Sequence, residues 1–273
     1  MSHLDTVSGG AAAAAAPGSV PALRIDQVRV EFGGIVALDS AVLTVEQDQV
    51  MGLIGPNGAG KTTLFNCVSR LYQPNAGSIE VFGTEVLAMR PDQMAGLRVA
   101  RTFQNVGVFG SETVLDNVML GAHVRTRAGM WATSLGLPSV RRTEHRERER
   151  AMGFLEELEL DRHAGELAGD LPFGSLKRLE LARALMMQPR LLMLDEPANG
   201  LIHEEVMELA ELVRRLRAQH ELAVLLVEHN MDMVSSLCDA VTVLDLGRTI
   251  AVGTADEVRS DPRVVEAYLG GAE

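Results

Sequence analysis

Three short apolar runs each lead directly into residues that can bind a ligand. Val50–Ile54 precedes a glycine-rich stretch, Leu191–Leu194 runs into two acidic residues, and Leu222–Val227 runs into Glu-His-Asn. Such runs, bounded by polar or turn residues, are typical of strands buried on both faces in a parallel sheet. Because ligands bind beyond the carboxyl ends of these strands, we expect the polar residues after them to share one site.

Helical periodicity separates the strands. The segments Leu176–Met187 and His203–His220 each carry one broad apolar side. Thr254 followed by Glu257 indicates a helix with a capping box, and Pro262 is placed to open the last helix. Further strands are expected over residues 24–30, 41–45, 78–82, 100–105, 240–244 and 249–252. This alternation predicts an α/β fold with a mainly parallel sheet and a small antiparallel layer formed by the first strands.

The glycine-rich stretch GPNGAGKTT matches the P-loop pattern G-x-x-x-x-G-K-[ST] at every defined position. Its glycines allow the backbone to approach a ligand, and its N–H groups with the following helix N-terminus form an anion site. Lys61 supplies a positive charge for the β- and γ-phosphates, and Thr62 a hydroxyl for Mg²⁺. The binding stretch comprises Gly55, Pro56, Asn57, Gly58, Ala59, Gly60, Lys61, Thr62 and Thr63.

Polar residues at the other strand ends fit phosphoryl transfer. Asp195 is placed to hold Mg²⁺, and Glu196 to orient or deprotonate an attacking water. His229 can contact the γ-phosphate, and Gln104 can reach both metal and water. Phe32, before a Gly-Gly turn, can stack on an adenine ring. Phosphoryl transfer requires positioning and charge neutralisation rather than covalent chemistry, so these residue types suit it together.

The overall composition narrows the possible partners. The net charge of −12 argues against a general nucleic-acid binder, and the 47 % apolar content indicates a globular chain. Cys67 and Cys238 have no metal-ligand spacing around them, so buried, free thiols are expected. No apolar run reaches the roughly 18 residues that a membrane span needs, and no signal peptide is evident, which predicts a cytoplasmic protein. Residues 1–21, rich in Ala, Gly and Ser, are interpreted as a disordered tail.

One charged segment allows two interpretations. Arg141–Arg150 contains five Arg and three Glu. As a helix it forms a solvated face with internal salt bridges. A nucleic-acid role is disfavoured because acids nearly balance bases and no aromatic residues are interleaved.

Taken together, these motifs make residues 22–273 resemble an ATP-binding-cassette ATPase. Besides the P-loop (Walker A), the chain has a Q-loop at Arg101–Gln104, Walker B in LLMLDE, an H-loop at Val227–Asn230 and a signature motif at Leu171–Ser175. The resemblance implies a RecA-like P-loop NTPase core with an α-helical subdomain inserted over about residues 90–180. It also implies cofactor ATP with Mg²⁺, and a head-to-tail dimer in which Gly174 and Ser175 contact the ATP of the partner cassette.

Several stretches resemble one branch, the larger ATP-binding subunit of bacterial branched-chain amino-acid importers: FGGIVAL, ARTFQNVGVF, RLELARAL and EAYLG. This resemblance implies a second cassette, identical or different, two membrane-spanning permease subunits and, indirectly, a periplasmic or lipid-anchored binding protein. The chain is then expected on the cytoplasmic face of the inner membrane, without nucleic acid. A cassette of another system, such as lipopolysaccharide export, and a soluble non-transport cassette protein stay open as alternatives.

The chain departs from the family pattern at two positions. Pro172 stands where the signature usually has Ser, and so lacks both a hydroxyl and an N–H. Ile202 lies where the loop after Walker B usually has Asp or Asn. We therefore expect an active ATPase with a weaker homodimer, which a partner cassette of different sequence would complete.

Overall fold

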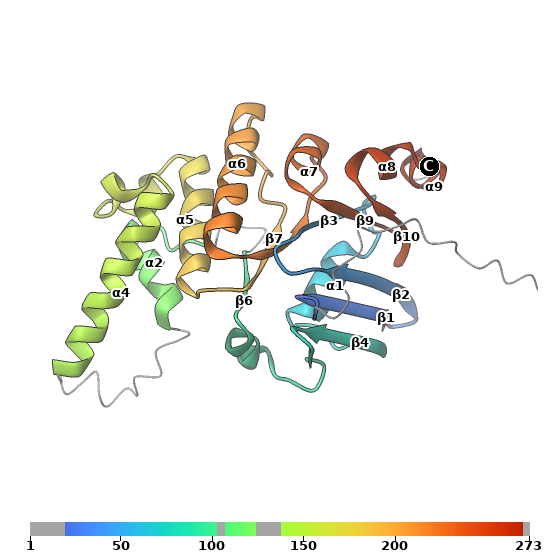
Figure 1. Ribbon diagram of the computed structural model, residues 1–273, viewed down its shortest axis with the longest axis horizontal. Helices are drawn as coiled ribbons and strands as arrows, with labels where there is room; N and C mark the ends of the chain where they lie inside the picture. The colour runs from blue at the N-terminus through green and yellow to red at the C-terminus, as the bar shows by residue number, and fades with distance from the viewer. Residues whose placement is uncertain (1–19, 103–106, 124–137, 270–273) are drawn as a thin grey trace, which may run out of the picture.

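The computed structural model describes residues 20–102, 107–123 and 138–269, which form two β-sheets flanked by helices (Figure 1). The larger sheet has six strands in the order β10-β9-β3-β8-β7-β6. β3 lies inside this sheet and is parallel to both β8 and β9, whereas β10 pairs antiparallel to β9. The strands are β3 (Val50–Ile54), β6 (Val99–Arg101), β7 (Leu191–Asp195), β8 (Ala223–Val227), β9 (Ala240–Asp245) and β10 (Arg248–Gly253).

The three apolar runs expected to be buried strands are β3, β7 and β8, and every residue in them is buried. Their nearly continuous hydrophobicity follows from coverage on both faces, as parallel sheets require. The mainly parallel α/β core predicted from the sequence is confirmed. β6 is shorter than the expected strand: it ends at Arg101, and residues 103–106 lie outside the described part of the chain.

The smaller sheet is antiparallel, with the strand order β2-β1-β4-β5. Thr249 of β10 joins it to the larger sheet, because its Oγ1 donates to Val42 O (2.7 Å) and accepts from Val42 N (3.1 Å). The expected antiparallel layer is thus present and is held by a residue near the other end of the chain. Its strands are β1 (Leu23–Phe32), β2 (Ile35–Val45), β4 (Ala76–Val81) and β5 (Thr84–Glu85).

The helices connect the strands and cover the larger sheet (Figure 1). α5 begins at Phe173, three residues before the expected start, because extended Pro172 precedes it as the N-cap residue. Pro91 opens a 3₁₀ helix, η1 (Pro91–Leu97). The α-helices are α1 (Lys61–Val68), α2 (Val114–His123), α4 (Pro138–Glu157), α5 (Phe173–Met186), α6 (His203–His220), α7 (Met231–Leu237), α8 (Ala255–Ser260) and α9 (Pro262–Leu269).

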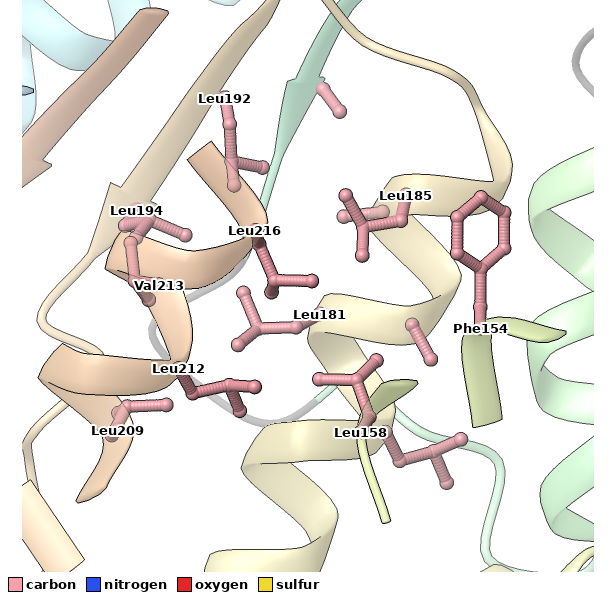
Figure 2. Close-up of a cluster of buried hydrophobic side chains, with 14 of the residues drawn as sticks. Phe154, Leu158, Leu181, Leu185, Leu192, Leu194, Leu209, Leu212, Val213 and Leu216 are labelled. Carbon is pink, nitrogen blue, oxygen red and sulfur yellow. The ribbon is translucent and has the colours of Figure 1, made fainter. Parts of the chain in front are cut away.

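A large apolar core packs α4, α5 and α6 together and against β7 (Figure 2). Leu181 and Leu185 of α5 lie between side chains of α4, α6 and the strand. Each fully buried Leu or Phe stabilises the fold by about 1.5–3 kcal/mol, so this cluster fixes α5 relative to the sheet. The labelled members are Phe154, Leu158, Leu181, Leu185, Leu192, Leu194, Leu209, Leu212, Val213 and Leu216.

Helix capping and surface charge agree with the sequence-based expectations. Glu257 Oε2 accepts from Thr254 N (2.8 Å), and Glu257 N donates to Thr254 Oγ1 (3.3 Å), which forms the predicted capping box. These hydrogen bonds lower the pKa of Glu257.

The Arg-rich segment lies in α4, where Arg150 pairs with Glu147 at 2.8 Å. Within the described residues, no helix is both long enough and apolar enough to cross a bilayer.

Candidate functional site

The P-loop joins the end of β3 to the start of α1, as the motif predicts. Gly55 has φ 150°, and a Cβ there would lie 2.1 Å from the backbone oxygen of Leu244. Gly60 has φ 101°, and its Cβ would lie 2.7 Å from the backbone oxygen of Ala37. Both positions therefore require glycine, for dihedral and for steric reasons. Neighbouring segments hold the loop from outside.

The remaining loop residues divide into an inner and an outer set. Ala59 is buried, and its carbonyl oxygen accepts a hydrogen bond from Gly247 N at 2.9 Å. Asn57, Gly58 and Thr62 are exposed, which leaves their polar groups accessible to a ligand. Pro56, Gly60, Lys61 and Thr63 are partly exposed.

Lys61 folds back over the loop that precedes it. Its Nζ donates to Gly55 O at 2.7 Å and to Pro56 O at 2.9 Å. Burial lowers the pKa of Lys61, and the charge of Glu196 partly opposes that shift. The ammonium group thus lies inside the loop, within electrostatic range of the acidic residue after β7.

Asp195 and Glu196 occupy the carboxyl end of β7. Asp195 is only 4 % exposed and ends the strand. Glu196 has φ 48°, a left-handed conformation that costs a non-glycine residue about 1–3 kcal/mol. Its N–H donates to Val227 O at 2.9 Å, which fixes this turn against β8. The left-handed backbone at Glu196 thus marks the turn by which the chain leaves β7.

His229 follows β8 and faces the same edge. Its Nδ1 lies 4.0 Å from Glu196 Oε1, and 63 % of its side chain is exposed. Val227 pairs with Leu53 of β3 on one side and with Asp195 of β7 on the other. The three strands therefore end at the same level, which brings the P-loop, the acidic pair and His229 together.

Glu228 is a site residue to which the sequence analysis assigned no separate role. It is fully buried, and its Oε1 accepts from Ala198 N at 2.7 Å. Its Oε2 accepts from the amides of His229 (3.0 Å) and Asn230 (3.1 Å). One carboxylate thus ties the loop after β7 to the loop after β8. The sequence did contain a signal for this role. Glu228 comes directly after a buried strand, where a charged group needs fixed hydrogen-bond partners.

Phe32 lies at the end of β1 and is about half exposed. Its ring meets Tyr72 edge-on, with centroids 5.2 Å apart and an interplanar angle of 72°. Edge-to-face pairs of this kind stabilise ring orientation. Tyr72 was not a candidate from the sequence, and stacking of Phe32 on adenine stays a prediction.

Gly174 and Ser175 belong to the first turn of α5. Figure 1 places α5 well apart from α1, with β7 between them in this view. A Cβ on Gly174 would lie 3.1 Å from Glu205 Oε1, so Gly174 lies against α6. Within one chain, the helix that carries these two residues therefore lies apart from α1 (Figure 1). Gln104 lies outside the described residues.

The oxygen atoms near the P-loop fit a magnesium ion held with a nucleotide. The described residues contain no group of three or more His, Cys, Asp or Glu that could hold a metal alone. Thr62 and Asp195 offer one hydroxyl and one carboxylate, which are hard oxygen ligands. Mg²⁺ commonly binds through one or two such groups together with substrate phosphates. These two oxygen ligands therefore suit Mg²⁺ that is bound together with phosphates. They do not suffice for a metal centre made by the protein alone.

The chain belongs to the ABC transporter family and is an ATPase of the ATP-binding-cassette class. The family model described as ABC transporter matches residues 38–199, and the model described as branched-chain amino acid ATP-binding cassette transporter matches residues 248–273. The chain is 41 % identical to the high-affinity branched-chain amino acid transport ATP-binding protein BraF of Pseudomonas aeruginosa. It is 39 % identical to LivG of Escherichia coli K12, which carries the same description. Each alignment covers 93 % of this chain and 100 % of the relative.

Solved structures confirm the predicted fold class. A nucleotide-free ATP-binding cassette from an ABC transporter superposes with a TM-score of 0.80 at 30 % identity, covering 91 % of this chain and 98 % of that one. The ADP conformation of MJ1267, an ATP-binding cassette of an ABC transporter, gives 0.79 at 28 % identity, covering 92 % and 99 %. The fold and the family assignment thus agree over nearly the whole chain.

Proposed function

We propose that the chain binds and hydrolyses ATP to power the uptake of branched-chain amino acids, or similar small solutes, through separate membrane subunits. The names of BraF and LivG support this transport role, and both relatives match along their entire length. The match of residues 248–273 to a branched-chain amino acid transporter model supports the same branch independently of the P-loop region.

The observation that carries the ATPase proposal is the convergence of Lys61, Asp195, Glu196 and His229 at the ends of three neighbouring parallel strands. Lys61 and the P-loop amides hold the β- and γ-phosphates. Thr62 and Asp195, with Gln104, would hold Mg²⁺, and the bound ion would supply positive charge to neutralise the phosphates.

Glu196 and His229 take the remaining roles in hydrolysis. From its position directly after β7, Glu196 orients the attacking water and accepts its proton. His229, mostly exposed and 4.0 Å from Glu196, is placed to donate a hydrogen bond to the γ-phosphate. Phe32, about half exposed at the end of β1, stacks on the adenine ring. Each group positions or neutralises charge, as phosphoryl transfer requires.

The signature residues Gly174 and Ser175 complete the site of a second cassette. Pro172 and Phe173, which directly precede them, are exposed, and this supports the role because a partner's P-loop can approach this end of α5. Pro172 removes one donor from that contact, and Ile202 places an exposed apolar side chain where a polar one is usual. A heterodimer with a complementary cassette accommodates both departures.

Partner subunits in the membrane couple ATP hydrolysis by this chain to the movement of the solute. We assign residues of about 90–180 to a helical subdomain, against which two membrane-spanning permease subunits dock near the Q-loop. The chain then acts peripherally at the cytoplasmic face of the inner membrane. A periplasmic or lipid-anchored binding protein supplies the solute without contacting this chain.

Replacing Glu196 with Gln tests the catalytic assignment. The amide keeps the size of the side chain but cannot accept a proton, so we expect a loss of hydrolysis of about 100-fold or more with ATP binding retained. An ATP-bound dimer should accumulate and elute as such in size-exclusion chromatography. The exposed Glu204→Gln change serves as the matched control. Hydrolysis by Glu196→Gln at the unaltered rate would make the assignment wrong.

A further inference from the structure

The side chain of Arg101 connects two parts of the proposed nucleotide site that belong to different elements. At the end of β6, its Nη2 donates to Asp195 Oδ2 at 2.9 Å. Its Nη1 donates to Asn66 Oδ1 at 2.7 Å and to Ser69 Oγ at 3.1 Å. The Arg101 side chain is 13 % exposed, so the pair with Asp195 is largely shielded from solvent. One guanidinium group therefore links the Walker B carboxylate to the P-loop helix.

The geometry of this contact requires an arginine. The planar guanidinium reaches two elements at once and also lies over the Phe65 ring, 4.8 Å from its centroid. A lysine ammonium is a single point charge and cannot hold this fork of contacts. Asn66 follows Thr62 by four residues and so lies on the same face of α1. Arg101 thereby relates the position of Asp195 to the face of α1 that carries Thr62.

The two carboxylate oxygens of Asp195 have different surroundings. Oδ2 accepts the bond from Arg101, while no hydrogen bond within the described part of the chain reaches Oδ1. A carboxylate that is held at one oxygen presents the other in a fixed direction. Partners of this kind around metal-binding carboxylates orient the ligand and tune its metal affinity.

We propose that Arg101 is a positioning residue, which orients Asp195 toward the metal and thereby sets the affinity of the nucleotide-bound site for a divalent cation. This inference rests on the proposed function, in which Thr62 and Asp195 hold Mg²⁺. The rival explanation is a buried ion pair that stabilises the fold without affecting the metal. That explanation predicts a change in unfolding only, because the folded variant would bind the cation as before.

The test measures Mn²⁺ binding by electron paramagnetic resonance to the full chain saturated with ADP. Arg101→Lys keeps the positive charge but removes the fork, so we expect Mn²⁺ affinity to fall by about tenfold or more, the range for partners of metal ligands. Arg98→Lys is the matched control, since Arg98 immediately precedes the same strand and, within the described part of the chain, its side chain donates to Gln188 O and not to Asp195 or α1. Its Mn²⁺ affinity should equal that of the unaltered chain.

A second variant keeps the test decisive if Arg101→Lys does not fold. Asn66→Ala removes one acceptor of Arg101 without touching Asp195, and should lower Mn²⁺ affinity in the same direction by a smaller factor. Mn²⁺ affinity unchanged within twofold in the folded variants overturns the positioning role. Failure of the unaltered chain to bind Mn²⁺–ADP would instead contradict the proposed function itself.

Discussion

At the scale of single residues, Glu228 shows how a buried charge can serve the site without contacting a ligand. Its carboxylate is fully buried and accepts hydrogen bonds from three backbone N–H groups in two different loops. Hydrogen bonds from amides to a charged acceptor are stronger than neutral ones. The loop that carries Ala198 and the loop that carries His229 therefore keep a fixed relation.

Replacing Glu228 with Gln should destabilise the protein by about 2–4 kcal/mol, because a charged acceptor is lost and the new NH₂ group faces backbone donors. Urea denaturation followed by circular dichroism measures this change. The exposed Glu112→Gln change is the control and should leave the free energy of unfolding nearly unaltered. A Glu228→Gln protein as stable as the control would show that the carboxylate charge is dispensable.

The two thiols predict a loss of stability in alkali. Burial raises the pKa of Cys67 to about 11 and that of Cys238 to about 12, against an ordinary thiol value of 9.0. Above pH 9 the unfolded thiol ionises while the folded thiol stays protonated, so the free energy of unfolding should fall between pH 9 and 11. Urea titrations at pH 8, 9.5 and 10.5 measure this slope. Cys67→Ala should show a shallower fall, and an identical slope would contradict the assignment.

At the scale of elements, the core between α5 and the sheet determines where the signature turn lies (Figure 2). α5 is packed through Leu181 and Leu185, and its first turn carries Gly174 and Ser175. Since those residues are proposed to meet a partner's nucleotide, loosening the core should affect the dimer as well as the monomer.

Leu181→Ala should cost about 2–5 kcal/mol, the usual range when a buried leucine leaves a cavity. Leu269→Ala makes the same chemical change at an exposed position and should cost little. Thermal unfolding monitored by circular dichroism compares the two variants. Equal melting temperatures would show that α5 does not depend on this cluster.

Local pattern was sufficient to predict the elements that carry the chemistry. The strand and the glycine-rich loop of the P-loop could be predicted because β3 is wholly apolar and its loop requires glycines. Strand order was beyond prediction, since nothing local to β3 specifies β8 and β9 as its neighbours. The hydrogen bonds from Arg101 to α1 and Asp195, and from Ala198 to Glu228, could not be predicted either, because each joins residues 30 or more positions apart in sequence. Which side chains reach one another depends on packing that the hydrophobic pattern does not encode.

At the scale of the whole molecule, the proposed function gives one chain two unlike half-sites. The P-loop edge holds Lys61 and Glu196, and the first turn of α5 offers Pro172 and Gly174 at a distance from it. In the proposed dimer, the departure at Pro172 affects only the ATP bound by the partner. A heterodimer would then have one site with the altered signature and one without.

Pro172→Ser should raise the ATPase rate of the purified homodimer by up to about tenfold, the effect of one added hydrogen bond to a charged phosphate. A coupled-enzyme assay at saturating ATP measures this rate. Pro262→Ser, exposed at the start of α9, is the control and should leave the rate unchanged. A rate that does not rise would show that Pro172 is not what limits this half-site.

The P-loop is contacted by segments that lie far along the chain, so it should take its final shape only late in synthesis. Gly55 lies against the Leu244 carbonyl, Ala59 accepts from Gly247, and β3 is bordered by β8 and β9. The P-loop is translated early, but the segments around Leu244 and Gly247 that contact it emerge from the ribosome nearly two hundred residues later. Such long-range pairing forms late. Ribosome-bound chains stalled before β8 has emerged should therefore retain no labelled ATP analogue, whereas chains extended well past β10 should retain it.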